Sequence, residues 1–505
     1  MRVLFIRPNS GYYVLMAPHP PLASLALASF LQSKGHTVRI FDRLIDHGLI
    51  KTVREFQPDA VAVTLIGEAT IPDAMEVSKA IKRWRCEVPV FWGGHLPSAI
   101  PELAARAGCV DYVGISEGEY TLLELLEVAE GKRARETVPG IAYVDENGEY
   151  HRTADRPFAD LADFPPLDYS LIPVERFLAK YPFANRVFYM STSKGCPFNC
   201  AFCFNKEYHH CQRRAYPREV IFQQIKTLVE SYRVDGIQIY DEIFGTDPQD
   251  LREFCQSMKN MKLNLTWASG TAVGILSRED LEMMYDAGCR TLAFGLESGS
   301  AEMRRKIKKP YDASKLDETF HNCREIGIST WGLFIVGLPD ETPEQVRETV
   351  RLCLRLHMDV VDINFFTPIP GSQLYRELVA VGRLNPSKTL EGMEHNAMEH
   401  QHLYDNYSCI PDKELQVIQK FFLWDLVFGK KKKAAGTKRF VSTSTAIMNM
   451  LHYFRNVGLR GLVRGLWESA KLFFTVAWYA HAYPSIRKKY GLYAKNYGRT
   501  DWDDA

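Results

Sequence analysis

Short apolar runs that end in glycine or polar residues recur along the first 410 residues, with helix-patterned segments between them. Five such runs lie at residues 3–6, 37–41, 60–66, 88–92 and 110–115. Six more follow at residues 187–190, 236–240, 265–268, 291–295, 330–336 and 361–365. Strands that alternate with helices form parallel sheets, because each parallel connection needs a long crossover. The sequence therefore predicts an α/β fold with two parallel-sheet units, the second either open or closed into a barrel.

The 505 residues are too many for one ordinary domain, and the pattern predicts four parts. Residues 1–140 form a Rossmann-like domain, in which ligands bind beyond the carboxyl ends of the strands. Residues 141–184 are a connector that includes a hairpin, residues 185–410 are the second α/β unit, and residues 411–505 are mainly helical.

The charge and the apolar pattern of the chain indicate which partners and which cellular compartment to expect. The net charge of +1 gives no global attraction to nucleic acid. The amino terminus turns polar at Arg7-Pro8-Asn9, too early for a signal peptide, and no stretch reaches the roughly 18 apolar residues of a membrane span. We therefore expect a cytoplasmic protein, in which the eleven cysteines are thiols or metal ligands rather than disulfides.

The strongest local signal is a cysteine motif at the end of a predicted strand. Cys196, Cys200 and Cys203 have C-x3-C-x2-C spacing. Three thiolates can bind three corners of a [4Fe–4S] cube and leave one iron open, as a catalytic metal site requires. The alternative is a zinc site, for which Cys211, His209 or His210 could supply the fourth ligand.

This motif resembles the signature of the radical S-adenosylmethionine (SAM) superfamily. The resemblance extends over residues 185–410, because motifs at five strand ends follow the family order. It implies a partial (β/α)6 barrel in which Phe202 lies near the adenine of SAM, and the segment with Asp241 and Glu242 holds the methionine amino group. It also implies cofactor contacts at the later strand ends, at Glu297, Ile335, Gly337 and Pro368.

One strand end departs from the family pattern. After Trp267, many relatives continue to an arginine that could face the carboxylate of the cofactor, whereas here the next arginine is Arg278, an expected helix start. Ser269 or Thr271 is the candidate for this polar contact.

The first domain resembles the cobalamin-binding domain found ahead of one branch of radical SAM enzymes. The similar segments are residues 2–8, 21–26, 35–42, 93–95 and 117–119. No Asp-x-His-x-x-Gly motif occurs, so the resemblance implies a corrin whose own base and any protein histidine are both away from cobalt, with Leu65 or Ile66 beneath it. The implied cobalamin contacts are Asn9, Leu65, Ile66, Gly93, Gly94, His95, Glu117 and Gly118.

Two alternatives stay open for this domain. His95 could be a loop residue bonded to the backbone rather than a cobalamin contact. The domain could also be a vestigial or dinucleotide-binding Rossmann fold, but the G-x-G-x-x-G motif of dinucleotide sites is absent after the first strand.

Together the two resemblances imply a cobalamin-dependent radical SAM enzyme that methylates an unactivated carbon through a 5′-deoxyadenosyl radical and methylcobalamin. The implied partners are a small-molecule, lipid or natural-product substrate and a flavodoxin- or ferredoxin-type electron donor. The alternatives are cyclisation or rearrangement of a porphyrin-like or lipid substrate, and a non-enzymatic corrinoid and iron–sulfur electron-transfer protein. RNA methylthiolation would need a further cysteine trio in the first domain, where Cys86 and Cys109 are isolated.

The carboxy-terminal part is helical and aromatic. The Lys430 to Lys433 run is typical of a solvated linker. The apolar segment 472–482 has the pattern of a buried helix. Contact with a membrane surface is the minority alternative, because this segment is flanked by Arg460, Arg464, Lys471 and Arg487.

Overall fold

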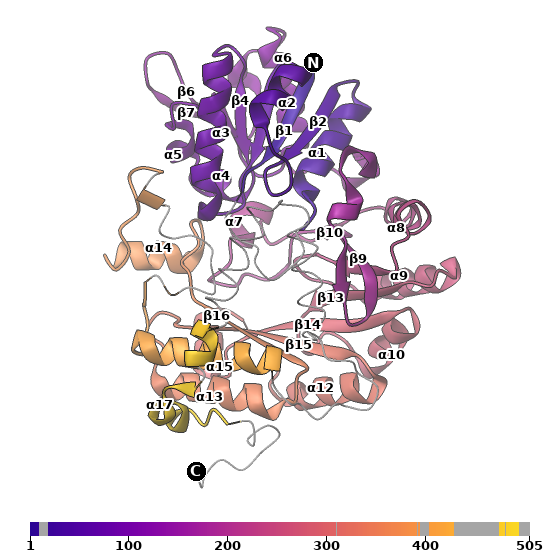
Figure 1. The fold of residues 1–505 in the computed structure, drawn as a ribbon, viewed down its shortest axis with the longest axis vertical. Helices are drawn as coiled ribbons and strands as arrows, with labels where there is room; N and C mark the ends of the chain where they lie inside the picture. The colour runs from indigo at the N-terminus through magenta and orange to yellow at the C-terminus, as the bar shows by residue number, and fades with distance from the viewer. Residues whose placement is uncertain are drawn as a thin grey trace.

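The computed structural model describes residues 1–9, 19–309, 311–390, 392–393, 403, 405–428, 474–479 and 481–493. It forms two α/β units that lie one above the other in Figure 1, with the amino-terminal unit at the top. The predicted α/β class is confirmed, and each unit contains one large sheet.

The first sheet has seven strands, of which the first five in the chain are parallel. In spatial order they are β2 (Thr37–Asp42), β1 (Arg2–Arg7), β3 (Ala60–Thr64), β4 (Val90–Gly93), β5 (Tyr112–Gly114), β6 (Ile141–Val144) and β7 (Tyr150–Arg152). The hairpin β6–β7 pairs antiparallel with β5. It was predicted as part of the connector, and it extends the first sheet beyond residue 140.

Helices cover both faces of this sheet. They are α1 (Leu22–Ser33), α2 (Leu49–Phe56), α3 (Ile71–Trp84), α4 (His95–Ala99), α5 (Pro101–Ala105) and α6 (Glu119–Ala129). Val3 and Phe5 of β1 pack with residues of α1 and α6, whereas Leu4 and Ile6 pack with residues of α2 and α3. Because both faces of the sheet are buried, the parallel strands have apolar residues at consecutive positions in the sequence.

The second sheet contains the six predicted strands in sequence order, all parallel, with a short antiparallel strand at one edge. The strands are β8 (Ala179–Tyr181), β9 (Ala184–Met190), β12 (Gly236–Ile239), β13 (Thr266–Thr271), β14 (Cys289–Glu297), β15 (Ser329–Val336) and β16 (Val360–Phe365). Because β16 and β8 are the two ends of the sheet in the described residues, the structure is an open partial barrel.

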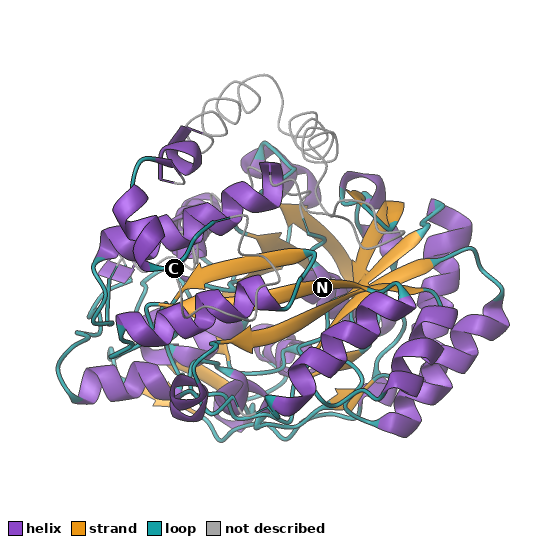
Figure 2. Ribbon diagram, turned by 90° about the horizontal axis from the view of Figure 1, so that it is seen from below, coloured by secondary structure: helices purple, strands orange, loops and turns teal. Residues whose placement is uncertain are grey.

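Helices cover the outer face of this sheet and lie in front of its strands in Figure 2. Two other helices, α11 (Ala301–Lys306) and α14 (Gln373–Ala380), pack in a separate hydrophobic cluster with Ala201. The helices that cover the outer face are α8 (Arg218–Tyr232), α9 (Pro248–Met261), α10 (Arg278–Asp286), α12 (Ser314–Ile326) and α13 (Pro343–Arg355). Every second residue of β15, including Phe334 and Val336, is buried against them. Local signals fix the helix starts: Ser277 and Thr342 each form a capping box, at α10 and α13.

Between the sheets lie the two-stranded ribbon of β10 (Ser193–Lys194) and β11 (Arg214–Ala215), and the short helix α7 (Asn205–His209). These elements carry the cysteine motif. They place it at the boundary between the two units (Figure 1).

The carboxy-terminal helices α15 (Asp412–Phe428) and α17 (Pro484–Lys489) belong to the second unit. Leu415, Ile418 and Phe422 of α15 join the same hydrophobic cluster as β15 and β16. Residues 430–433, Arg460, Arg464 and Lys471 lie outside the described residues. Of the predicted segment 472–482, residues 474–479 are helical.

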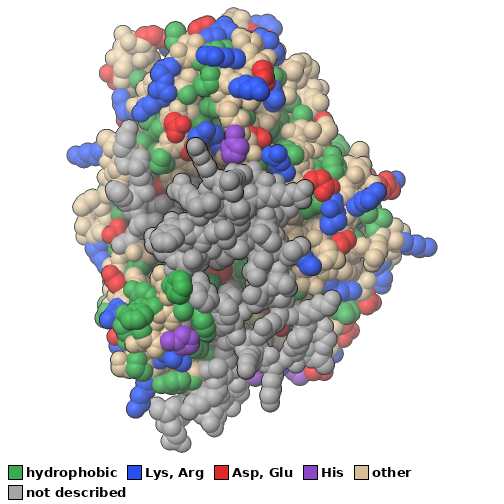
Figure 3. All heavy atoms as spheres, viewed as in Figure 1, with side chains coloured by type: hydrophobic (Ala, Val, Ile, Leu, Met, Phe, Trp, Pro, Cys, Tyr) green, Lys and Arg blue, Asp and Glu red, His purple; other side chains and the backbone are tan. Residues whose placement is uncertain are grey.

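The described residues include no helix that is both long enough and apolar enough to cross a membrane. Lys and Arg side chains are interspersed with Asp and Glu side chains over the described part of the face in Figure 3. This mixture agrees with the near-zero net charge.

Candidate functional site

The cysteine loop, residues 195–204, joins β10 to α7 and carries all three predicted thiols. Asn205, the first residue of α7, holds the loop in place. Its side-chain Oδ1 accepts a hydrogen bond from the Cys196 N–H at 3.1 Å, and its Nδ2 donates to the carbonyl oxygens of Cys196 (2.7 Å) and Phe198 (2.9 Å). The Asn205 N–H also lies 3.4 Å from the Cys203 sulfur. The Asn205 side chain therefore stabilises the backbone of the cysteine loop, a role that was not predicted from the sequence.

Gly195 opens the loop in a conformation that only glycine adopts easily. Its φ is +80°, and a Cβ there would lie 2.1 Å from the carbonyl oxygen of Gln212. The chain after α7 therefore packs directly on the start of the cysteine loop.

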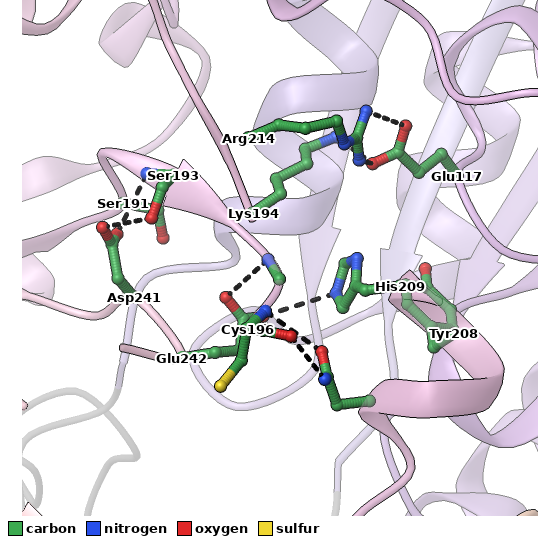
Figure 4. Close-up of polar contacts among 12 residues, drawn as sticks. Glu117, Ser191, Ser193, Lys194, Cys196, Tyr208, His209, Arg214, Asp241 and Glu242 are labelled. Carbon is green, nitrogen blue, oxygen red and sulfur yellow. Dashed lines mark hydrogen bonds and ion pairs between the residues drawn. The ribbon is translucent and has the colours of Figure 1, made fainter. Parts of the chain in front are cut away.

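Asp241 and Glu242, just beyond β12, bond to the strand and loop around the thiols. Asp241 accepts four hydrogen bonds from the N–H and hydroxyl groups of Thr192 and Ser193, at 2.5–3.2 Å (Figure 4). Burial raises the pKa of Asp241 to about 6, although these hydrogen bonds act in the opposite direction. The structure thus places this predicted cofactor contact beneath β10, with both carboxylate oxygens already bonded.

Glu242 is the member of this pair that reaches the cavity described below. Its Oε2 accepts from the Gly195 N–H at 3.1 Å, and its Oε1 lies 3.5 Å from His209 Nε2. Burial alone would raise the pKa of Glu242, but His209 and the Gly195 N–H bring it below the usual value.

A partly buried lysine, Lys309, faces the three thiols. Lys309 Nζ lies 3.3 Å from Glu297 Oε1, and burial alone would lower its pKa, but Glu297 and the thiols raise it. Burial raises the pKa of each thiol, that of Cys200 to about 11, while the charge of Lys309 acts in the opposite direction. Glu297 was predicted from the sequence but Lys309 was not, since a lysine in a basic run (Lys306, Lys308 and Lys309) carries no distinguishing signal.

An apolar cluster lies behind the cysteine loop. It includes the loop residue Ala201, and two predicted cofactor residues, Phe202 and Ile335, pack against its edge while remaining partly exposed. Of the other predicted residues nearby, Gly337 has a φ of +81° and donates its N–H to Glu341, and Pro368 is buried.

The two residues proposed for the missing arginine contact do not face the inner side of the sheet. Ser269 pairs with Leu292, whose side chain packs on the helices, and Thr271 donates to the Phe244 carbonyl oxygen. Gly270 lies between them on the inner face, with open space where a Cβ would be. Arg278 begins α10, as predicted.

A cavity of about 270 Å³ lies at the carboxyl ends of β3, β4 and β5 and reaches the cysteine-loop region of the second unit. Its walls come from α1, α6, β10 and α7. Five predicted residues line it: Gly93, Gly94, His95, Glu117 and Gly118. Gly94 allows the chain after β4 to pass close to the backbone of Leu65, because a Cβ at Gly94 would lie 2.4 Å from the Leu65 carbonyl oxygen.

The other three predicted cobalamin contacts lie outside the walls of this cavity. Leu65 has a fully buried side chain in the core, Ile66 is 52% exposed, and Asn9 is exposed with its N–H bonded to Asp73.

His95 packs on the helix that follows the cysteine loop. Its ring lies 4.2 Å from that of Phe204 and 4.4 Å from that of Tyr208. Burial, and secondarily His209, lower the pKa of His95 to about 4, so the ring is neutral at pH 7. His209 itself is 4% exposed and lines the cavity, and its Nδ1 has no hydrogen-bond partner among the described residues.

Comparison with known proteins supports both units. Residues 190–353 match the model of the radical SAM superfamily, and residues 14–126 match that of the B12 binding domain. The chain belongs to the radical SAM enzymes that carry a B12-binding domain. The predictions of this family, of an enzyme and of the fold class are therefore confirmed.

Two relatives and one solved structure define this similarity. An uncharacterized methyltransferase of Pyrococcus horikoshii is 29% identical over 75% of this chain and 83% of its own length. The anaerobic magnesium-protoporphyrin IX monomethyl ester cyclase of Rubrivivax gelatinosus is 29% identical over 75% of this chain and 70% of its own length. The fold is that of the methyltransferase TsrM from Kitasatospora setae, solved with cobalamin and a [4Fe–4S] cluster, at a TM-score of 0.69 and 18% identity over 92% of this chain and 99% of that chain.

The residues present fit the cofactors of this radical SAM family. The cysteine loop offers three soft thiol donors on one short segment, with a lysine beside them to offset thiolate charge. The cavity offers an unpartnered His209 Nδ1 and an apolar wall from α1 and α6. Among the described residues, no three His, Cys, Asp or Glu side chains are placed to hold a single metal ion.

Proposed function

We propose that this protein is a cobalamin-dependent radical SAM methyltransferase that acts on an unactivated carbon of a small-molecule, lipid or natural-product substrate. The observation that carries the proposal is the cavity at the carboxyl ends of the first sheet, whose far wall is formed by Lys194, Tyr208 and His209 on either side of the cysteine loop. A corrinoid in this cavity would lie next to a cluster on Cys196, Cys200 and Cys203.

When bound, the cluster supplies an electron, SAM supplies a carbon radical and cobalamin supplies a methyl group. The protein's own residues orient these groups and exclude water. Asn205 and Asp241 hold the cysteine loop, while Glu297 and Lys309 present a carboxylate and an ammonium beside the thiols. Phe202 and Ile335 are the proposed adenine contacts, because both lie at the edge of the apolar cluster behind the loop.

The proposed cobalamin contacts are the cavity residues Gly93, Gly94, His95, Glu117 and Gly118. His95 is proposed as a packing contact rather than a cobalt ligand, because its ring is enclosed by Phe204 and Tyr208. A flavodoxin- or ferredoxin-type protein is the proposed source of the electron.

The test begins with anaerobic purification after cobalamin supplementation, followed by iron, sulfide and cobalt analysis. We expect both iron and cobalt, and we expect a Cys203→Ala variant to lose iron and keep cobalt. Under reduction, label from methyl-labelled SAM should appear in the extracted corrin, with S-adenosylhomocysteine and 5′-deoxyadenosine as products. Iron without cobalt would contradict the methyltransferase.

A second function is favoured by one observation, the 29% identity to the magnesium-protoporphyrin cyclase. A cyclase or rearrangement enzyme would use the same two sites. It would form 5′-deoxyadenosine without moving the methyl label from SAM to the corrin, so the labelling experiment separates the two functions.

A further inference from the structure

The loop between β5 and α6 of the first unit, together with Glu119 at the start of α6, contacts the chain before and after the cysteine loop of the second unit. Before the cysteine loop, Lys194 donates from Nζ to Glu119 Oε1 at 2.7 Å. After it, the Tyr208 hydroxyl donates to the Ser116 carbonyl oxygen at 2.8 Å, and the Ser116 hydroxyl donates to the Tyr208 carbonyl oxygen at 3.1 Å. One short loop of the B12-binding domain therefore contacts the chain on both sides of the thiols.

The contact before the cysteine loop is a shielded ion-pair network. The side chains of Lys194 and Glu119 are 20% and 6% exposed. Glu117 lies 3.6 Å from Lys194 Nζ and also pairs with Arg214 of β11 (Figure 4).

The residues that make these contacts are also walls of the cavity. Ser116, Glu117, Glu119, Lys194 and Tyr208 all line it. A ligand that fills the cavity must therefore contact or displace the network that connects the two units. Lys194 directly precedes Gly195 and Cys196, so a ligand that changes how its side chain is held acts next to the start of the cysteine loop.

We propose that Lys194 is a positioning residue that couples occupation of the cavity to the geometry of the cysteine loop, so that cobalamin and SAM strengthen each other's binding. This inference rests on the proposed function, because it takes cobalamin as the occupant. Coupling between two sites is reciprocal, so each ligand must change the affinity of the other by the same factor.

The experiment measures this factor in the reconstituted full-length protein. Equilibrium dialysis gives the Kd of labelled SAM with and without hydroxocobalamin, and the Kd of hydroxocobalamin with and without SAM. In the wild type we expect both ratios to be equal and about 5-fold or more. In Lys194→Met, which keeps the length but removes the charge, both ratios should fall to within twofold of one.

Two further variants make the result specific. Lys194→Met leaves Glu119 buried without its partner, so the double variant with Glu119→Gln removes both charges and should show the same loss of coupling. Lys82 provides the matched control, because its 2.6 Å ion pair with Asp111 has a lysine of similar exposure (21%) but lies wholly within the first unit. Lys82→Met should keep the wild-type ratios.

Two results would overturn the coupling alone: no mutual effect of the ligands in the wild type, or wild-type ratios in both Lys194 variants. Failure of the wild type to bind cobalamin at all is a different outcome. It would overturn the proposed function, and the coupling with it.

Discussion

Replacement of Asn205 by alanine should release the cysteine loop while leaving the three thiols in the chain. The side chain makes three hydrogen bonds to the backbone of the loop, at 2.7–3.1 Å, and is 4% exposed. Cys196 and Phe198 are partly exposed residues, so we expect water to replace the lost partner and take the net value of about 1 kcal/mol per bond. The ordered loop should therefore lose about 3 kcal/mol relative to open conformations.

This free energy corresponds to a factor of roughly 100 in the loop equilibrium, since each 1.4 kcal/mol is tenfold. A cluster needs the ordered loop, so its apparent affinity should fall by the same factor. The measurement is the rate of iron loss to a chelator after anaerobic reconstitution, together with iron and sulfide per chain. Asn205→Asp should lose iron faster still, because its second oxygen would face two carbonyl oxygens in place of the donating amide.

The matched control is Asn322→Ala. Asn322 is also buried (8% exposed) and accepts a hydrogen bond from Arg278 at 3.1 Å, but it lies on α12. This variant should retain iron as the wild type does. Equal iron content and equal chelation rates in Asn205→Ala and the wild type would refute the argument that the side chain orders the loop.

Three other changes have outcomes that follow from the structure. Gly195→Ala should abolish cluster loading, measured as iron per chain, because the new Cβ would lie 2.1 Å from the Gln212 carbonyl oxygen at a φ of +80°. Leu122→Trp should fill the cavity and weaken cobalamin binding at least tenfold without changing iron content, which parallel cobalt and iron analysis would check. Burial raises the pKa of Glu341 to about 8, so its contribution to stability is complete below about pH 4.5 and is lost as pH rises through 8. Glu341→Gln should remove this loss, on the order of 3–5 kcal/mol. A variant whose denaturation midpoint falls between pH 5 and pH 8.5 as much as that of the wild type would contradict the prediction.

The strands of both sheets were predictable because their burial is simple. Parallel strands covered on one or both sides give apolar runs, and the polar or glycine residues at their carboxyl ends mark where each run stops. The predicted runs therefore agree with the strands to within a few residues, as in the run 330–336 and β15 (Ser329–Val336). The cysteine motif was predictable for a related reason, since its ligands are local in sequence.

Side-chain direction at the strand ends was harder to predict. Whether Ser269 or Gly270 faces the inner side of the second sheet depends on register, and β13 and β14 shift register between Trp267 and Ala268. A shift of one residue exchanges the two faces of a strand. The residue predicted for the polar contact, Ser269, therefore lies on the helix-packed face of β13.

Contacts between residues far apart in the sequence could not be predicted from local sequence patterns. Lys194 and Glu119 are 75 positions apart, and each belongs to a motif that has its own explanation within its own domain. Their meeting depends on how the two units dock, which no local periodicity encodes. The same holds for His95, which resembles a loop residue in sequence and forms an aromatic contact between the units in the structure.

The docking of the two units bears on the order in which the cofactors act. A radical formed before the corrinoid is in place would react with whatever is nearest, including the protein. An enzyme with both cofactors therefore benefits when the cysteine loop reaches its final geometry only with the cavity filled. The loop of residues 116–119 is the element that can provide this order, because its side chains line the cavity and its hydrogen bonds reach both sides of the thiols. On this argument, removal of cobalamin should slow the reductive cleavage of SAM in the wild type but not in Lys194→Met, since only the wild type transmits occupation of the cavity to the cysteine loop.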